Sequence, residues 1–182
     1  IVVPRIEFRR SDPLVKVKAV PNGPAGNGAE ARGNVALQPL VYGATADNWE
    51  AFAELAKKHG APMAIRADSL NELAELTEKI KGAGFTWIHV IPSVKAAQRC
   101  KKAGVDVIVA SGHEGGFHTH WEPLHSMVLI PAVVDAVSGE KTLVVGAGGI
   151  SDGRTLAASL VMGSDGVLMG TRFLATQESD FH

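Results

Sequence analysis

The chain has 182 residues, of which 46% are hydrophobic and 20% charged, and its formal net charge is −1. This balance, without a run of Lys or Arg, gives no electrostatic basis for nucleic-acid binding. Charged residues, Gly or Pro interrupt every apolar stretch within about ten residues, which excludes a membrane-spanning helix, and no secretory signal is visible. The single cysteine, Cys100, excludes an internal disulfide and fits a reducing compartment. We therefore expect a cytoplasmic protein.

The first 38 residues differ in character from the rest of the chain. Two short stretches, IEFRR and VKVKAV, can each form a strand. They are followed by PNGPAGNGAEARGN, whose glycines, prolines and asparagines predict a loop or a boundary. We therefore separate an irregular N-terminal segment, residues 1–38, from a second domain over residues 39–182.

One pattern repeats from residue 39 onward. An apolar run is followed by a capping residue, an amphipathic helix and a glycine. Helices are expected from about Asp47, Ser69, Ser93 and Asp152, and Gly82 is expected at the C-cap of the second. Strands as uniformly apolar as these belong to a parallel sheet that helices cover. The runs are PLVYGAT, PMAIRA, FTWIHVIP, VDVIVAS, TLVVGAGG and GVLMGT.

Six such units predict an α/β fold, either a doubly wound sheet or a barrel. The short, regular spacing of the strands, without a topological switch point, favours a (β/α)8 TIM barrel. A complete barrel has eight strands, whereas six are clear here and the two short stretches near the N-terminus are the candidates for the others. The chain also starts at Ile1 rather than Met, and no helix is predicted to close the last unit. We therefore expect an incomplete or trimmed barrel.

Two glycine-containing turns follow the last two predicted strands, where barrels place their functional groups. The first is GAGGIS, residues 146–151, and the second is MGTRF, residues 169–173. Glycine lets backbone N–H groups approach an anion, and a helix N-terminus favours negative charge. The first turn alone could simply need glycine for a positive φ. Together, the two turns predict a phosphate site, and we expect Arg172 to form a structural ion pair.

A histidine-rich segment, VIVASGHEGGFHTHWEPLH, extends from Val107 to His125. Histidine exchanges a proton near neutral pH, so His113, His118 and His120 are candidates for an acid–base role. The spacing of the histidines matches no zinc pattern, and no cysteine accompanies them. We therefore predict no metal site here.

Three motifs, taken in order, resemble the nitronate monooxygenase (2-nitropropane dioxygenase) family of FMN-dependent barrel enzymes, to which flavin-dependent enoyl-ACP reductases are related. They are HVIPSVKAAQRCKKAGVDVIVASGHEGGFH, SMVLIPAVVDAV and VVGAGGISDGRTLAASLVMGSDGVLMGTRFLATQES, and they cover about residues 85–182. The family's loop motif, A-x-G-x-E-A-G-G-H, aligns with residues 110–118, although Gly115 replaces an alanine and Phe117 a glycine.

This resemblance implies an oxidoreductase that binds FMN and a small molecule. His118 would remove the proton α to the nitro group, and the resulting carbanion would be oxidised by FMN. Because Phe117 is a bulkier neighbour for this base, the substrate can be a nitronate or nitroalkane, or a related enoyl or acyl compound. The implied cofactor-binding residues are Ser111 and Gly116 beside the flavin, and Gly148, Gly149, Gly170 and Thr171 around its phosphate.

Two alternatives are kept. Residues 39–84 are similar to the barrel of the corrinoid iron–sulfur protein large subunit, which implies a corrinoid-associated protein of one-carbon metabolism. The chain could also be a non-catalytic barrel that binds a phosphorylated ligand. The first reading predicts flavin, the second cobalamin, and the third binding without turnover. A homo-oligomeric state is left open by all three.

Overall fold

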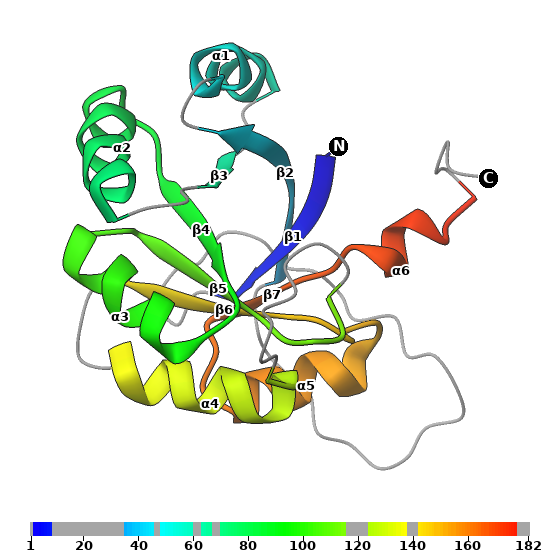
Figure 1. Ribbon diagram of the computed structural model, residues 1–182. Coiled ribbons are helices and arrows are strands. Elements are labelled where there is room, and N and C mark those ends of the chain that lie inside the picture. Colours follow the sequence, from blue (N-terminus) through cyan, green and yellow to red (C-terminus); the bar gives the residue numbers. More distant parts are fainter. Residues whose placement is uncertain are drawn as a thin grey trace.

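The computed structural model describes residues 2–8, 35–45, 48–59, 63–66, 70–115, 124–137 and 142–177. Strands and helices alternate along most of this length, and the strands close into a barrel (Figure 1). None of the helices in these ranges is both long and apolar enough to cross a membrane. The elements are β1 (Val2–Phe8), β2 (Val35–Thr45), α1 (Trp49–His59), β3 (Met63–Arg66), α2 (Leu70–Gly82), β4 (Trp87–Ile91), α3 (Val94–Ala103), β5 (Val107–Ser111), α4 (Ser126–Val137), β6 (Leu143–Ala147), α5 (Gly153–Val161), β7 (Gly166–Leu168) and α6 (Thr171–Leu174).

The barrel has seven strands in the described part of the chain, arranged in sequence order. Strands β2 to β7 are parallel and correspond to the six predicted units, so the barrel prediction is confirmed. Closure differs from the expected eight-stranded pattern, because β1 is antiparallel to both β2 and β7. By pairing with both, β1 satisfies the two edges that six parallel strands would leave open.

The N-terminal part of the chain contributes to this closure. Strand β1 overlaps the predicted IEFRR strand, whereas VKVKAV lies outside the described residues. The expected boundary at residue 39 falls inside β2, which begins at Val35. Residues on both sides of that boundary therefore share one sheet.

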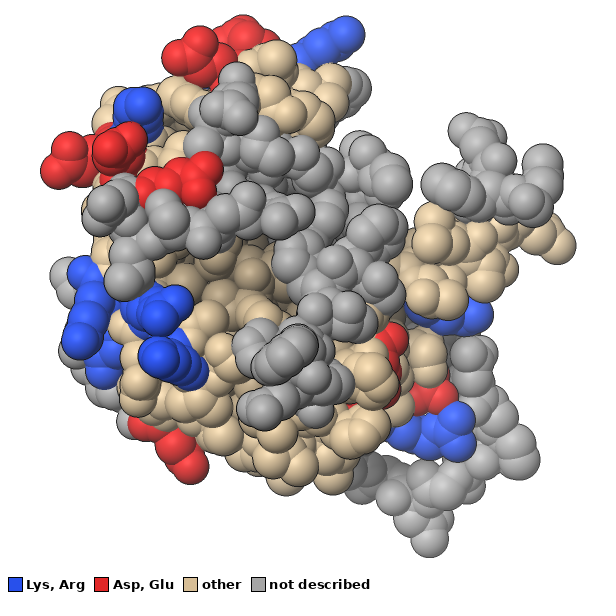
Figure 2. Space-filling model, viewed as in Figure 1, with Lys and Arg blue, Asp and Glu red and all other residues tan. Residues whose placement is uncertain are grey.

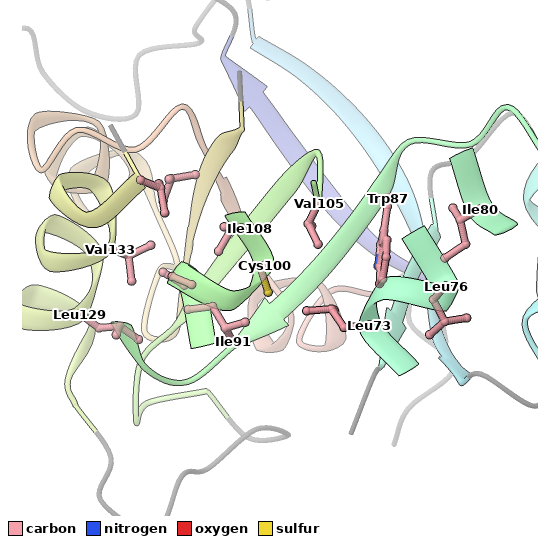
Figure 3. Packing of buried hydrophobic residues seen from close by; sticks show 14 of the residues in the cluster. Leu73, Leu76, Ile80, Trp87, Ile91, Cys100, Val105, Ile108, Leu129 and Val133 are labelled. Carbon is pink, nitrogen blue, oxygen red and sulfur yellow. The ribbon is translucent and has the colours of Figure 1, made fainter. Parts of the chain in front are cut away.

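The core has two layers, separated by the sheet. Along β5, Val107 and Val109 pack with residues of the strands β4, β6 and β7 and with no helical residue of the described chain, which places them inside the barrel. Ile108 and Ala110 point the other way, into a larger cluster with the helices. Figure 3 shows part of this outer layer. Its helical members include Leu76, Ile80, Leu129, Ile130 and Val133.

The capping predicted at Ser93 and Asp152 is confirmed, Asp47 and Ser69 lie outside the described residues, and the predicted end of α2 is corrected. Ser93 accepts a hydrogen bond from the N–H of Ala96 at 3.3 Å, and Asp152 forms a capping box with Thr155. For α2, however, Gly82 is still helical. The left-handed residue is Gly84, with φ of 79°, and its N–H donates to the Lys81 carbonyl at 2.9 Å.

Charge is distributed unevenly over the helices. Figure 2 shows acidic side chains mainly over α1 and α2, and basic ones over α3. Helix α3 has four basic residues and no acidic one in its sequence VKAAQRCKKA. The near-zero net charge of the chain therefore conceals a local positive excess along α3.

Candidate functional site

Strands β5, β6 and β7 end at the same level, and this edge carries the predicted site. Ser111 pairs with Ala147, and Ala147 pairs with Leu168. The turns after these three strands consequently start side by side. A small hydrophobic cluster also joins the last two turns, because Ile150 from the first packs with Met169 from the second. The two glycine turns are therefore neighbours, as the sequence predicts.

The turn after β6 requires glycine for two separate reasons. Gly148 and Gly149 have φ values of 95° and 71°, in the left-handed region. A Cβ on Gly148 would in addition lie 3.1 Å from the carbonyl oxygen of Gly112 and 3.2 Å from the nitrogen of Gly115. The N–H of Gly112 donates to the Ala147 carbonyl at 3.0 Å. The turns after β5 and β6 thus pack on each other through backbone atoms.

The N-terminus of α5 is already capped by its own residues. The carboxylate of Asp152 accepts the N–H groups of Arg154 and Thr155 at 2.9 and 3.2 Å. The Thr155 hydroxyl oxygen accepts the N–H of Ser151 at 3.0 Å and that of Asp152 at 3.1 Å. An anion at this turn would therefore have to use N–H groups that precede Ser151.

The turn after β7 is uncapped by comparison. Gly170 occupies the N-cap of α6 without a side-chain hydrogen bond, and a Cβ placed on it would meet no atom within 4 Å. Gly170 and Thr171 are both exposed. The expected ion pair of Arg172 is not found among the described residues. This turn therefore offers free backbone donors beside open space.

The histidine-rich loop is fastened where it leaves β5 and where it enters α4. The N–H of His113 donates to the Leu124 carbonyl at 2.9 Å, and that of Gly115 donates to the Gly112 carbonyl at 2.9 Å. The carboxylate of Glu114 accepts the N–H of Ser126 at 3.1 Å. Burial alone would raise the pKa of Glu114, but hydrogen bonds from backbone N–H groups and from His125 outweigh it and lower the pKa.

Only one of the three candidate acid–base histidines can be placed. His113 is exposed, and its ring meets that of His125 edge to face, with centroids 5.4 Å apart. His118, His120 and Gly116 lie outside the described residues. The described part of the chain contains no group of three or more His, Cys, Asp or Glu side chains that could hold a metal ion.

Comparison with known proteins identifies the family. The family model for nitronate monooxygenase matches residues 20–182. The chain belongs to the nitronate monooxygenase family. The match starts well before the motifs that carry the resemblance, and it includes the segment that was compared with a corrinoid protein.

Named relatives cover part of the chain. A (3aS,4S,5R,7aS)-5-hydroxy-7a-methyl-1-oxo-octahydro-1H-indene-4-carboxyl-CoA dehydrogenase of Rhodococcus jostii is 50% identical over 108 residues, 58% of this chain and 28% of the relative. A probable nitronate monooxygenase of Staphylococcus haemolyticus is 44% identical over 114 residues, 58% of this chain and 31% of the relative. The chain therefore matches less than a third of the length of these relatives.

Solved structures agree on the fold. FabK (M276A mutant) from Thermotoga maritima is 30% identical with a TM-score of 0.62, covering 79% of this chain and 46% of that one. Nitroalkane oxidase from Streptomyces ansochromogenes is 28% identical with a TM-score of 0.57, covering 73% of this chain and 40% of that one. The nitronate monooxygenase barrel of this chain is thus similar to less than half of each structure.

The structure explains one departure from the family's loop motif. Ser111 continues the inward face of Val107 and Val109 and is 8% exposed. A Cβ on Gly115, where the motif has alanine, would lie 2.6 Å from the Ser111 hydroxyl oxygen. In this chain the serine hydroxyl therefore occupies the volume that an alanine methyl group would need.

Sequence reasoning missed Glu114, which links the two ends of the loop. One signal was available, because α4 starts without a good capping residue. The residue before Ser126 is His125, whereas Ser, Thr, Asp or Asn is preferred at that position. A helix without its own cap predicts a carboxylate or hydroxyl from elsewhere.

Proposed function

We propose that this chain acts as an FMN-dependent oxidoreductase of the nitronate monooxygenase type, with His118 as its base. The observation that carries the proposal is the alignment of the turns after β5, β6 and β7 at one edge of the barrel. It brings the two glycine turns beside residues 112–115, where the segment that contains His118 begins. Family membership and the nitroalkane oxidase likeness support the same activity.

The two glycine turns suit the phosphate of FMN. The N–H groups of Gly149 and Ile150 make no hydrogen bond within the described residues, and Gly170 and Thr171 add uncapped donors. A Cβ at residue 170 would enter open space, so room exists beside these donors. Arg154 lies 2.6 Å from the Asp152 carboxylate, and its positive charge offsets the repulsion between that carboxylate and a bound dianion. We assign phosphate binding to Gly148, Gly149, Gly170 and Thr171.

The remaining residues serve the ring and the substrate. Ser111 and Gly116 would contact the flavin, and bound FMN would supply a two-electron acceptor. His118 would take the proton from the carbon next to the substrate's electron-withdrawing group. Near neutral pH an imidazole can both accept and return such a proton. Because Ser111 is polar beside the apolar interior side chains of β4, β5 and β6, its hydroxyl can orient a ring edge.

A second substrate class is favoured by one relative. The Rhodococcus protein is named a dehydrogenase of an acyl-CoA, and it is 50% identical over the matched region. The hydrogen α to a thioester and the hydrogen α to a nitro group are both acidified by the neighbouring group. The same base and acceptor can therefore serve either. We propose a nitronate or nitroalkane as substrate, with an acyl-CoA thioester as the alternative.

We place the protein in the cytoplasm, since its one thiol is buried and unpaired. The corrinoid reading is not retained, because the family match includes the segment on which it rested.

The test combines cofactor binding with turnover. Purified protein titrated with FMN should quench flavin fluorescence and should then oxidise a nitronate or an acyl-CoA. His118→Ala should lower the rate by roughly 10²–10⁴-fold while FMN binding persists. His113→Ala is the matched control and should leave the rate nearly unchanged. Absence of FMN binding, or full activity in His118→Ala, would contradict the proposal.

A further inference from the structure

We propose that Glu114 is a positioning residue, which holds the loop that carries His118 by capping helix α4 from outside the helix. The role of His118 rests on the proposed function. The capping contact itself rests on the described geometry alone.

Helix α4 lacks a cap of its own. The carbonyl of His125 accepts the N–H groups of Val128 and Leu129, both at 2.9 Å, so His125 occupies the N-cap. Histidine is not among the side chains that cap well. Glu114, located 12 residues before Ser126, accepts the Ser126 N–H with Oε2 at 3.1 Å and with Oε1 at 3.4 Å. A carboxylate here also faces the positive end of the helix dipole.

Further contacts make Glu114 part of a compact junction. Its Oε1 lies 3.3 Å from Nδ1 of His125, and its neighbour His113 donates to the Leu124 carbonyl. A Cβ on Gly112 would overlap the backbone of Ser126, which shows how closely the end of β5 approaches the start of α4. On the other side, a Cβ on Gly149 would lie 3.4 Å from Cβ of Glu114. The residue therefore joins the start of the loop to the start of α4 and lies beside the proposed phosphate turn.

Removal of the carboxylate should loosen the loop and leave the barrel intact. The Ser126 N–H and the His125 ring would lose their shared acceptor, while the barrel core contains no atom of Glu114. A base that is displaced by about 1 Å can lose roughly 100-fold in rate. We expect a lower kcat with little change in KM or FMN affinity, since Glu114 would act through His118 rather than on the ligand.

The experiment compares Glu114→Ala, Glu114→Gln and the control Glu75→Ala, whose side chain is exposed on α2. For Glu114→Ala we expect a fall in kcat of roughly 10- to 100-fold, a thermal midpoint lowered by no more than about 2–4 °C and faster amide exchange in the peptide that contains residues 113–126. The amide oxygen of Glu114→Gln can still accept from Ser126, so this variant should recover part of both effects. Glu75→Ala should match the parent chain.

The possible outcomes separate the two proposals. Unchanged amide exchange in Glu114→Ala would overturn the capping role, whatever the activity. A parallel loss of stability, FMN affinity and kcat would also overturn it, because it would indicate a purely structural residue. If the parent chain has no activity but exchange near Ser126 accelerates in Glu114→Ala, the cap stands and the proposed function fails. Should Glu114→Ala not fold, Glu114→Gln provides the same exchange readout with a smaller change.

Discussion

Gly148 and Gly112 lie in backbone contact across the edge of the barrel, with no side chain between them. A Cβ on Gly148 would lie 3.1 Å from the carbonyl oxygen of Gly112 and 3.2 Å from its nitrogen. This contact joins the turn that we assign to phosphate binding to the start of the loop that carries the proposed base. The distance between the two is therefore set by the backbone, which is the least adjustable part of the structure.

Gly148→Ala should consequently be costly. Alanine pays about 1–2 kcal/mol for a left-handed conformation, and overlap in a packed region adds about 1–3 kcal/mol. We expect the free energy of unfolding in urea to fall by the sum of these terms, and FMN binding to weaken in the same variant.

Gly149→Ala is the matched comparison. Its φ of 71° also carries a left-handed penalty, but the added methyl group would lie 3.4 Å from the nearest atom, an ordinary contact. The expected loss is therefore only about 1–2 kcal/mol. Equal losses in the two variants would mean that the contact with Gly112 contributes nothing.

Asp152 should make stability depend on pH in the acid range. A side-chain hydrogen bond from Arg154 and a backbone hydrogen bond from Thr155 lower the pKa of Asp152 from 3.8 to about 2. A lowered folded-state pKa stabilises the fold above the unfolded-state value, and this contribution is lost as the pH falls. Asp152→Asn should melt below the parent chain at pH 7, and the gap should narrow between about pH 4 and pH 2. A gap that is constant with pH would contradict this assignment, and Glu78→Gln, at an exposed position of α2, serves as the control.

The sequence predicts most of the parallel barrel because its signals are local. Alternating apolar runs and capping residues such as Ser93 and Asp152 depend on neighbours within one turn. The antiparallel strand β1 depends on partners more than 30 and 160 residues away, such as Val41 and Leu168, and no local pattern encodes them. The choice of Gly84 over Gly82 as the left-handed residue was missed for a different reason. Both glycines lie near the helix end, and the hydrogen bond from the Phe85 N–H to the Ile80 carbonyl, which the spacing of glycines does not indicate, accompanies the left-handed conformation at Gly84.

The candidate site likewise has features that the sequence predicts and features that it does not. The two glycine turns were predictable as neighbours because they follow consecutive strands of one sheet. The sequence did not predict that the N–H groups at the N-terminus of α5 are already hydrogen-bonded. Those bonds depend on the side-chain conformations of Asp152 and Thr155. The contact between Glu114 and Ser126 joins the two ends of a loop. The number of residues in a loop does not indicate which of its side chains meet, so this contact could not be predicted from sequence spacing.

Cys100 should be unreactive in the folded protein. Its side chain is 2% exposed, and burial raises the pKa of the thiol to about 12 although a backbone hydrogen bond opposes the shift. The thiolate is the reactive form, so almost none is present at pH 8. Reaction with a disulfide reagent should be slow in buffer and rapid in urea. Fast reaction in buffer would show that α3 opens readily.

Trp87 offers the sharpest test of the outer core. The residue is fully buried beside Leu73, Leu76 and Ile80 (Figure 3), and its indole nitrogen has no hydrogen-bond partner among the described residues. Trp87→Phe keeps a large ring and removes an unsatisfied donor, so it should lower the free energy of unfolding by less than about 1.5 kcal/mol. Trp87→Ala leaves a cavity and should lower it by about 3–5 kcal/mol. Urea unfolding of both variants distinguishes the two contributions. If Trp87→Phe is as destabilising as Trp87→Ala, the indole N–H contributes a hydrogen bond, and this bond stabilises the position of the ring in addition to hydrophobic packing.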